Sequence, residues 1–247
     1  MRKKHCESLI SECEEILGQI NIKFTKSFED PENKEILEPK VKSFLEHCRS
    51  ILEYCANDIF ELVISEQERT RKLKSKYNKV YFPYGKTKKI FRSSVSQNLP
   101  GLKSNDEQVY NLVEALQDYN RTSEKVFLSY MCKLTNENKH NSLSEHQRQS
   151  IKFTNIGNFV KVDDTSSVNF HNCVFNGKPT GDFIIQNGKI SGRINPQLLS
   201  EVFQYEEGEY VFKDTKKSVV DFLMLSLLEI KQFTNNLYVV IESKQVK

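Results

Sequence analysis

The sequence lacks any apolar run long enough to cross a membrane. Its longest run, residues 222–228, is interrupted by Ser226 and flanked by Asp221 and Glu229, whereas a spanning helix needs about 20 apolar residues. The amino terminus begins with basic residues but runs into an acidic amphipathic helix, unlike a signal peptide. With 247 residues, of which 38% are hydrophobic, the chain can fill a sizeable core. We expect a globular, cytoplasmic protein with no membrane partner.

The sequence also lacks the cysteine and histidine patterns that hold a metal ion or a disulfide framework. Its six cysteines include no Cys-x-x-Cys pair, and its five histidines form no His-x-His or His-x-x-x-His pair. Cys6 and Cys13, like Cys48 and Cys55, are seven residues apart and share a helix face with apolar neighbours. Thiols in this setting are usually reduced and buried. A metal site is the minority interpretation, and we expect no metal and no cofactor.

The first 146 residues place apolar side chains three and four residues apart, which is typical of amphipathic helices. The second predicted helix starts near Pro39, which the first turn of a helix tolerates. We predict that this helix continues toward Lys76, with last turns that are wholly polar and project from the core into water. The predicted elements are helices at 2–28, 39–76, 87–97, from Asn105 or Asp106 to Leu116, and at 122–134, with a short extended segment at 79–85.

Beyond His146 the apolar period changes from 3.6 to 2, which is typical of strands. Asn176-Gly177 and Asn187-Gly188 predict tight hairpin turns, and a last helix at about 215–237 has a wide apolar face suited to covering a sheet. We predict an α+β fold: an N-terminal helical-bundle domain, 1–146, followed by a domain at 147–247 of antiparallel β-sheet covered by the C-terminal helix. The predicted strands lie at 151–154, 159–162, 168–175, 183–185, 189–194 and 210–212.

Positive charge is concentrated between Ser65 and Lys103. This stretch contains 11 Lys and Arg against two Glu, a balance of +9, so the rest of the chain carries −6 to give the net +3. Aromatic residues lie among the cations, a mixture that neutralises phosphates and offers flat surfaces to unpaired bases. An ordinary packing strip with a solvated charged face is an equally good interpretation. The candidate nucleic-acid-binding residues are Arg69, Arg71, Lys72, Lys79, Lys86, Lys88, Lys89, Arg92, Tyr81 and Tyr84.

A dense polar cluster at residues 134–141 supplies the candidate catalytic residues: His140, Lys139, Asn136 and Lys133. A neutral histidine can take the proton from a ribose 2′-hydroxyl, a lysine can offset charge on the phosphorane, and an amide can hold phosphate oxygens. This mechanism needs no metal, and the sequence has no Asp-x-Asp grouping and no Gly-rich phosphate loop. The alternative is a capped helix end, where amides and lysines are common.

Four short stretches between about residues 40 and 145 carry a resemblance to a known family. They are Phe44-Leu45-Glu46-His47-Cys48-Arg49-Ser50-Ile51-Leu52-Glu53-Tyr54-Cys55-Ala56, Val80-Tyr81-Phe82-Pro83, Asn98-Leu99-Pro100-Gly101-Leu102 and Asn136-x-x-Lys139-His140. Together they look like a group of uncharacterised bacterial helical proteins, which in turn are similar to the HEPN superfamily. HEPN domains are helical bundles, often dimeric, and many are metal-independent RNases in toxin, antiphage and CRISPR settings.

The resemblance implies a bacterial defence or toxin-type protein that acts as a metal-independent endoribonuclease through His140, with two protomers joining their clusters in one cleft. The family hallmark is an Arg followed by a polar residue and, after four to six intervening residues, a His. His140 matches the histidine, but the nearest basic residue is Lys133, which is followed by the apolar Leu134, and lysine lacks the planar fork of arginine. The alternative is a non-catalytic subunit of a bacterial defence complex that binds a protein partner or nucleic acid such as RNA.

Overall fold

The computed structural model describes residues 1–29, 38–140, 146–156, 160–175, 177–199 and 202–245. The fold is α+β, with helices, antiparallel strands and a C-terminal helix. The chain forms two compact units, one of residues 1–146 with 212–247 and one of residues 147–211. We call them the helical unit and the β unit and describe each by itself.

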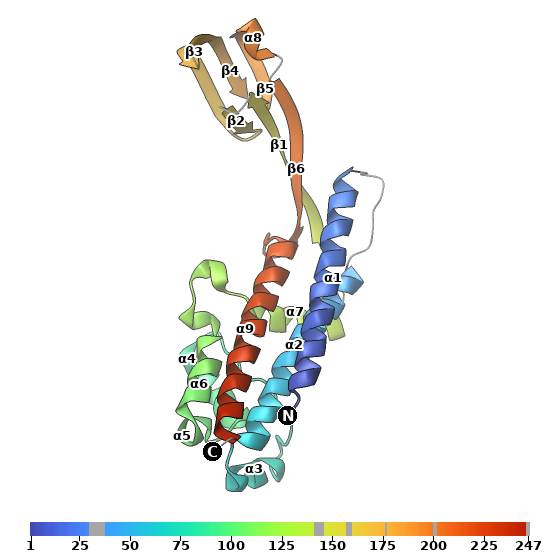
Figure 1. The fold of residues 1–247 in the computed structure, drawn as a ribbon, viewed down its shortest axis with the longest axis vertical. Helices are drawn as coiled ribbons and strands as arrows, with labels where there is room; N and C mark the ends of the chain where they lie inside the picture. Colours follow the sequence, from blue (N-terminus) through green and yellow to red (C-terminus); the bar gives the residue numbers. More distant parts are fainter. Residues whose placement is uncertain (30–37, 141–145, 157–159, 176, 200–201, 246–247) are drawn as a thin grey trace. The chain divides into compact units, whose positions relative to one another are not determined.

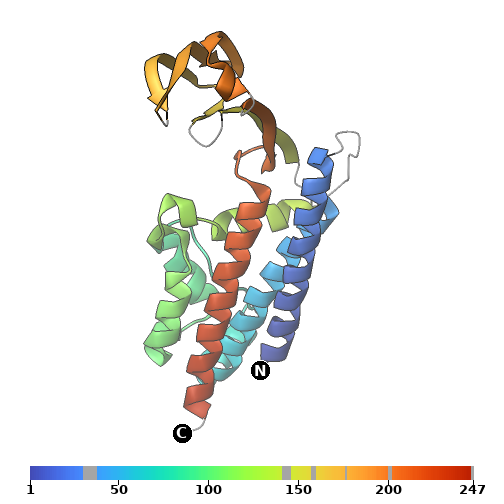
Figure 2. The ribbon, with the colours of Figure 1, turned by 45° about the horizontal axis from the view of Figure 1, so that its top comes forward.

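Three long helices form the centre of the helical unit: α1 (Lys3–Glu29), α2 (Glu38–Leu62) and α9 (Val219–Gln245). They lie side by side in both ribbon views (Figures 1 and 2), and each contacts the other two. The remaining elements are α3 (Glu66–Leu73), α4 (Lys88–Asn98), α5 (Leu102–Asn105), α6 (Glu107–Ala115), η1 (Asp118–Asn120), η2 (Ser123–Lys125) and α7 (Leu128–His140).

The cysteines at seven-residue spacing help to pack α1 against α2. All four are fully buried, and the Sγ atoms of Cys13 and Cys48 lie 4.0 Å apart. All six cysteines of the chain are free thiols, and Cys173 is the one that is partly exposed. Four thiols on two facing stripes therefore act as small apolar side chains at the helix interface.

The second helix ends earlier than predicted, because α2 stops at Leu62 instead of continuing toward Lys76. A turn buries Ile64, and Ser65 then caps a separate helix, its hydroxyl accepting a hydrogen bond from the Glu68 amide. Serine is a preferred N-cap residue. The polar residues predicted to extend α2 therefore form α3 instead.

The helix predicted at 122–134 is shifted toward the C-terminus, since α7 begins at Leu128 and ends at His140. The carboxylate of the buried Asp118 accepts hydrogen bonds from the amides of Phe127, Leu128 and Ser129 at 3.0, 3.0 and 2.7 Å. It satisfies the amides that the first turn of a helix leaves unpaired. Most of the polar cluster therefore belongs to the last turns of α7 and does not follow the helix.

The β unit consists of two three-stranded sheets, ordered β2-β1-β6 and β3-β4-β5. They share a core in which Ile156 and Val162 of the first sheet meet Phe183 and Ile185 of the second. Its elements are β1 (His146–Ile156), β2 (Val160–Asp163), β3 (Ser167–Phe175), β4 (Lys178–Gln186), β5 (Lys189–Ile194), α8 (Pro196–Leu199) and β6 (Val202–Phe212).

The predicted Asn-Gly turn between β4 and β5 is present. Asn187 and Gly188 both have positive φ, 51° and 69°, as a tight type I′ hairpin requires, and the antiparallel register runs up to the pair Gln186 and Lys189. Gly177, between β3 and β4, has a φ of 75°, while Asn176 lies outside the described residues.

The C-terminal helix packs in the helical unit and is not part of the 147–247 domain that the sequence predicted. Leu223, Ile230 and Leu237 on α9 are fully buried, and α9 contacts α1, α2 and α6. The helical unit is therefore built from two separate stretches of chain, and the β unit is an insertion between them. An apolar helix face shows that a partner exists, but a sheet and a helical bundle can both provide that partner.

Candidate functional site

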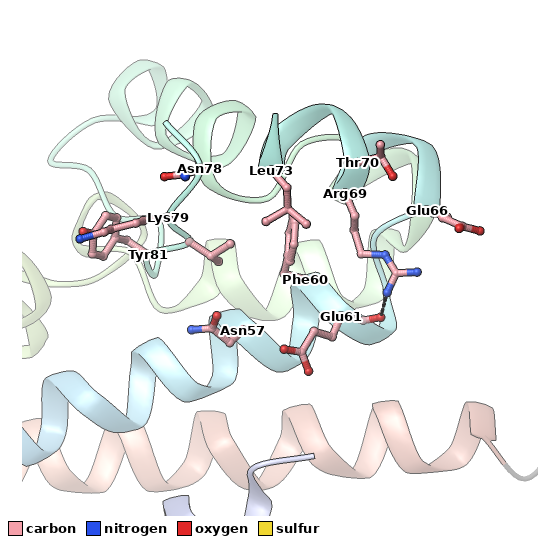
Figure 3. Close-up of a pocket in the computed structure, with 11 residues that line it drawn as sticks. Asn57, Phe60, Glu61, Glu66, Arg69, Thr70, Leu73, Asn78, Lys79 and Tyr81 are labelled. Carbon is pink, nitrogen blue, oxygen red and sulfur yellow. Dashed lines mark hydrogen bonds between the residues drawn. The ribbon is translucent and has the colours of Figure 1, made fainter. Parts of the chain in front are cut away.

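Two hollows flank α3 within the basic part of the helical unit. The larger, of about 670 Å³, lies between the end of α2, α3 and the extended segment that follows, and Figure 3 shows its lining residues. We call it the α2–α3 hollow. It is lined by Asn57, Phe60, Glu61, Glu66, Arg69, Thr70, Leu73, Asn78, Lys79, Val80 and Tyr81. The second hollow, of about 420 Å³, is lined by Glu68, Arg71, Lys72, Ser75, Tyr77, Ser96, Gln97, Pro100 and Gly101.

Most of the predicted binding cations are exposed, and two of the exposed ones, Arg71 and Lys79, line a hollow. We call the exposed side chains of residues 66–92 the α3 surface. Within the described part of the chain, seven of its cations have no carboxylate partner: Arg71, Lys74, Lys76, Lys79, Lys86, Lys89 and Arg92. Uncompensated cations concentrated in one stretch of chain create a positive potential that attracts polyanions.

Three of the predicted cations are held by the protein itself. The Arg69 guanidinium donates to the main-chain oxygen of Glu61, and Lys88 pairs with Glu114 at 3.3 Å. Lys72 is only 5% exposed and donates to the main-chain oxygen of Tyr77, and burial lowers the pKa of its ammonium group. Lys72 therefore has a structural position, and Lys88 is a weaker candidate contact than the unpaired Lys86 and Lys89.

The aromatic residues of the basic segment divide between surface and core. Tyr77 and Tyr81 are 56% and 48% exposed, whereas Phe82 and Phe91 are almost fully buried. Phe82 packs edge-on against Phe233 of α9, with ring centroids 5.5 Å apart. Both interpretations of this segment therefore describe part of it: the phenylalanines form a packing strip, and the two tyrosines face solvent among the cations.

Side chains from α2, from α4 and from the turn after α6 hold the extended segment that carries Tyr81. The Tyr81 amide donates to Asn98 Oδ1 at 3.2 Å, the Phe82 amide to Glu53 Oε2 at 2.7 Å, and the Gly85 amide to Gln117 Oε1 at 3.1 Å. Buried backbone amides need such partners when no neighbouring strand supplies them. These bonds fix which side chains of the segment point outward.

The candidate catalytic residues lie on the last three turns of α7. Lys133 is bonded to Asp214 at 2.9 Å and lies 3.7 Å from Glu137, so two carboxylates already balance its charge. Asn136 is exposed. His140 is the last residue of α7, and the side chains of Lys139 and His140 lie outside the described residues. His140 follows Asn136 by four residues, about one turn of α7.

An arginine that sequence reasoning missed contacts α7 at Cys132, eight residues before His140. The Arg49 guanidinium of α2 is 5.2 Å from the Tyr84 ring centroid, and it donates to Glu53 at 2.7 Å and to the Cys132 thiol. Burial raises the pKa of the Cys132 thiol to about 12, so the thiol stays protonated. Burial also raises the pKa of the half-buried Tyr84, and the side chain of Asn136 opposes that rise. Only the pairing of α2 with α7 reveals this cluster.

The described residues contain neither a metal-binding cluster nor a membrane-spanning helix. No group of three or more His, Cys, Asp or Glu side chains in the described part of the chain is arranged to hold a metal ion. None of the helices in the described ranges has the length and apolar character needed to span a membrane. Comparisons of the chain with protein-family models, with curated proteins and with solved structures found no match.

Proposed function

We propose that the helical unit binds nucleic acid across the α3 surface. The observation that carries this proposal is that exposed Tyr77 and Tyr81 share one stretch of chain with seven exposed cations that have no carboxylate partner in the described residues. Cations neutralise phosphates, and exposed aromatic rings add base contacts that a purely ionic surface lacks. A protein partner with an acidic surface needs the cations but gains less from the rings.

Charge reversal at two unpaired lysines tests this proposal. Lys86→Glu with Lys89→Glu should weaken binding of a fluorescent 12-nucleotide RNA about tenfold at low salt, because two phosphate contacts become repulsive. The slope of log affinity against log salt should also become shallower by about 1 to 2. Fluorescence anisotropy between about 50 and 300 mM salt measures both effects.

A second double variant separates the effect of the α3 surface on binding from the effect of net charge. Lys42→Glu with Lys125→Glu makes the same change in net charge, and both lysines lack an ion-pair partner among the described residues. Lys42 lies in the first turns of α2, about 30 Å along that helix from its junction with α3. This variant should bind like the wild type. Equal losses in both double variants would show that net charge, and not the α3 surface, controls binding.

We also propose RNA cleavage at the end of α7, motivated by the resemblance to HEPN domains. One observation favours it: the Arg49–Tyr84 pair brings a guanidinium close to Asn136, one turn before His140 on the same helix. In this mechanism His140 takes the proton of the attacking 2′-hydroxyl, while Asn136 and Lys139 bind the phosphate. An arginine from α2 supplies the planar cation that α7 lacks.

The test of cleavage is His140→Ala, assayed on labelled RNA without added metal and in the presence of a chelator. Loss of the general base should slow cleavage at least about 100-fold, while RNA binding to the α3 surface stays unchanged. Cleavage at the wild-type rate in this variant would remove His140 from the mechanism. Intact RNA with the wild-type protein would leave binding as the function of the chain.

A further inference from the structure

We infer that the α2–α3 hollow holds one unpaired base, so that the ligand of the α3 surface is a single-stranded nucleic acid. This inference rests on the proposed nucleic-acid binding and adds the class of ligand. Phosphate contacts alone do not distinguish one strand from two. The shape and lining of the hollow make that distinction.

The hollow has the size and the apolar walls that a base requires. Its volume of about 670 Å³ falls within the usual range for small-ligand pockets. Phe60, almost fully buried, lies deep in it, and Leu73 and Tyr81 line it while remaining 57% and 48% exposed. Figure 3 shows Leu73 and Phe60 together in the centre and Tyr81 to one side. These side chains can cover the faces of a planar ring, as stacking requires.

Polar groups of the hollow can read the edge of a base. Asn78 is exposed, and its amide has no hydrogen-bond partner among the described residues. The Asn57 amide nitrogen donates to the main-chain oxygen of Glu53 at 2.7 Å, which leaves its side-chain oxygen to accept. Two amides thus offer donor and acceptor groups of the kind that pair with base edges.

The charges around the hollow set the direction in which a nucleotide enters. Lys79 lies beside Tyr81, while Glu61 and Glu66 lie at the opposite side (Figure 3). The Glu61 carboxylate is already paired with Arg2 at 2.6 Å, and the Arg69 guanidinium on that side is bonded to the main-chain oxygen of Glu61. Lys79 is exposed and has no carboxylate partner among the described residues, so it is the cation of the hollow that is free to attract a phosphate. The base therefore points inward from the Lys79 side. A base stacked inside a duplex cannot enter without being unpaired.

An abasic oligonucleotide tests this inference, because it keeps the phosphates and removes the bases. Fluorescence anisotropy with the full chain compares three probes: a 12-nucleotide single strand, the same strand with abasic sites throughout, and the corresponding duplex. The normal strand should bind about tenfold more tightly than the abasic strand, the difference expected from stacking one base. Tyr81→Ala should remove that advantage and leave binding of the abasic strand unchanged.

Ile22→Ala is the control, since Ile22 on α1 is 58% exposed, lies outside the α3 surface and lines neither hollow. It should keep the preference for the normal strand. A preference lost in Ile22→Ala and kept in Tyr81→Ala would overturn the assignment to the α2–α3 hollow, as would equal binding of the normal and abasic strands. If those two strands bind equally and the charge reversal at Lys86 and Lys89 still weakens the binding of both, the α3 surface binds nucleic acid but the α2–α3 hollow does not hold a base. If none of the three probes binds at low salt, both proposals fail.

Discussion

Neighbouring aromatic residues of the extended segment have opposite roles. Tyr81 is half exposed and Phe82 is buried against α9, although the two are adjacent in the chain. Successive side chains of an extended backbone point in opposite directions. The sequence shows that one of the two side chains faces inward. The Tyr81 and Phe82 amides donate hydrogen bonds to Asn98 and Glu53, and these bonds hold the segment with Phe82 inward.

We expect Asp118 to contribute strongly to stability, because its buried carboxylate accepts hydrogen bonds from three amides at the start of α7. Asp118→Ala should lower the free energy of unfolding by about 2 kcal/mol, the upper range for loss of a helix cap. Urea denaturation followed by circular dichroism measures the change.

Thr87→Ala provides the comparison for Asp118→Ala. Thr87 caps α4 through a single hydrogen bond of 3.3 Å to the Ile90 amide, and its side chain is exposed. Its loss should cost about 0.5–1 kcal/mol. Equal costs in the two variants would mean that Asp118 acts as an ordinary exposed cap.

At the scale of elements, helical periods were easier to predict than helix ends. The stripes of α1 and α2 repeat over many turns, and Thr87 and Asp106 cap α4 and α6 close to the predicted starts. The break between α2 and α3 depends on a turn that buries Ile64. The start of α7 depends on Asp118, which lies ten residues before Leu128. Local pattern cannot show either of these contacts.

The residues of the candidate site also divide into those that the sequence locates and those that only the fold brings to the site. The basic segment and the polar cluster are contiguous in sequence, so composition alone located both. Residues of α2 contact both segments: Phe60 lines the α2–α3 hollow, and Arg49 lies beside Tyr84. Neither residue has a local signal, apart from the four-residue spacing of the Arg49–Glu53 pair.

At the scale of the whole molecule, the β unit is an insertion in the helical unit. Its first and last strands, β1 and β6, are hydrogen-bonded neighbours and run alongside each other in Figures 1 and 2. Strands arranged in this way let the chain leave and return at nearby points, which is typical of inserted domains. The helical unit can therefore be tested without the insertion.

Replacing residues 147–211 with a short Gly/Ser linker should leave the helical unit folded, because a short closing loop costs little entropy. Circular dichroism should show a cooperative helical melting transition. All residues of the α3 surface belong to the helical unit, so RNA affinity should stay within about threefold, the scatter expected for an uninvolved change. A larger loss in a folded variant would place part of the RNA contact in the β unit.

The sequence by itself determined the α+β class, the period change near His146, the hairpin turn at Asn187-Gly188 and the position of the positive charge. These features depend on side-chain periodicity, turn chemistry and composition, which are local. Only the tertiary structure decided that α9 packs with the helices, that Tyr81 faces outward and that Arg49 contacts Cys132 of α7. Each of these outcomes depends on contacts between residues far apart in the chain, and burial and hydrogen bonding select them only after the helices have packed.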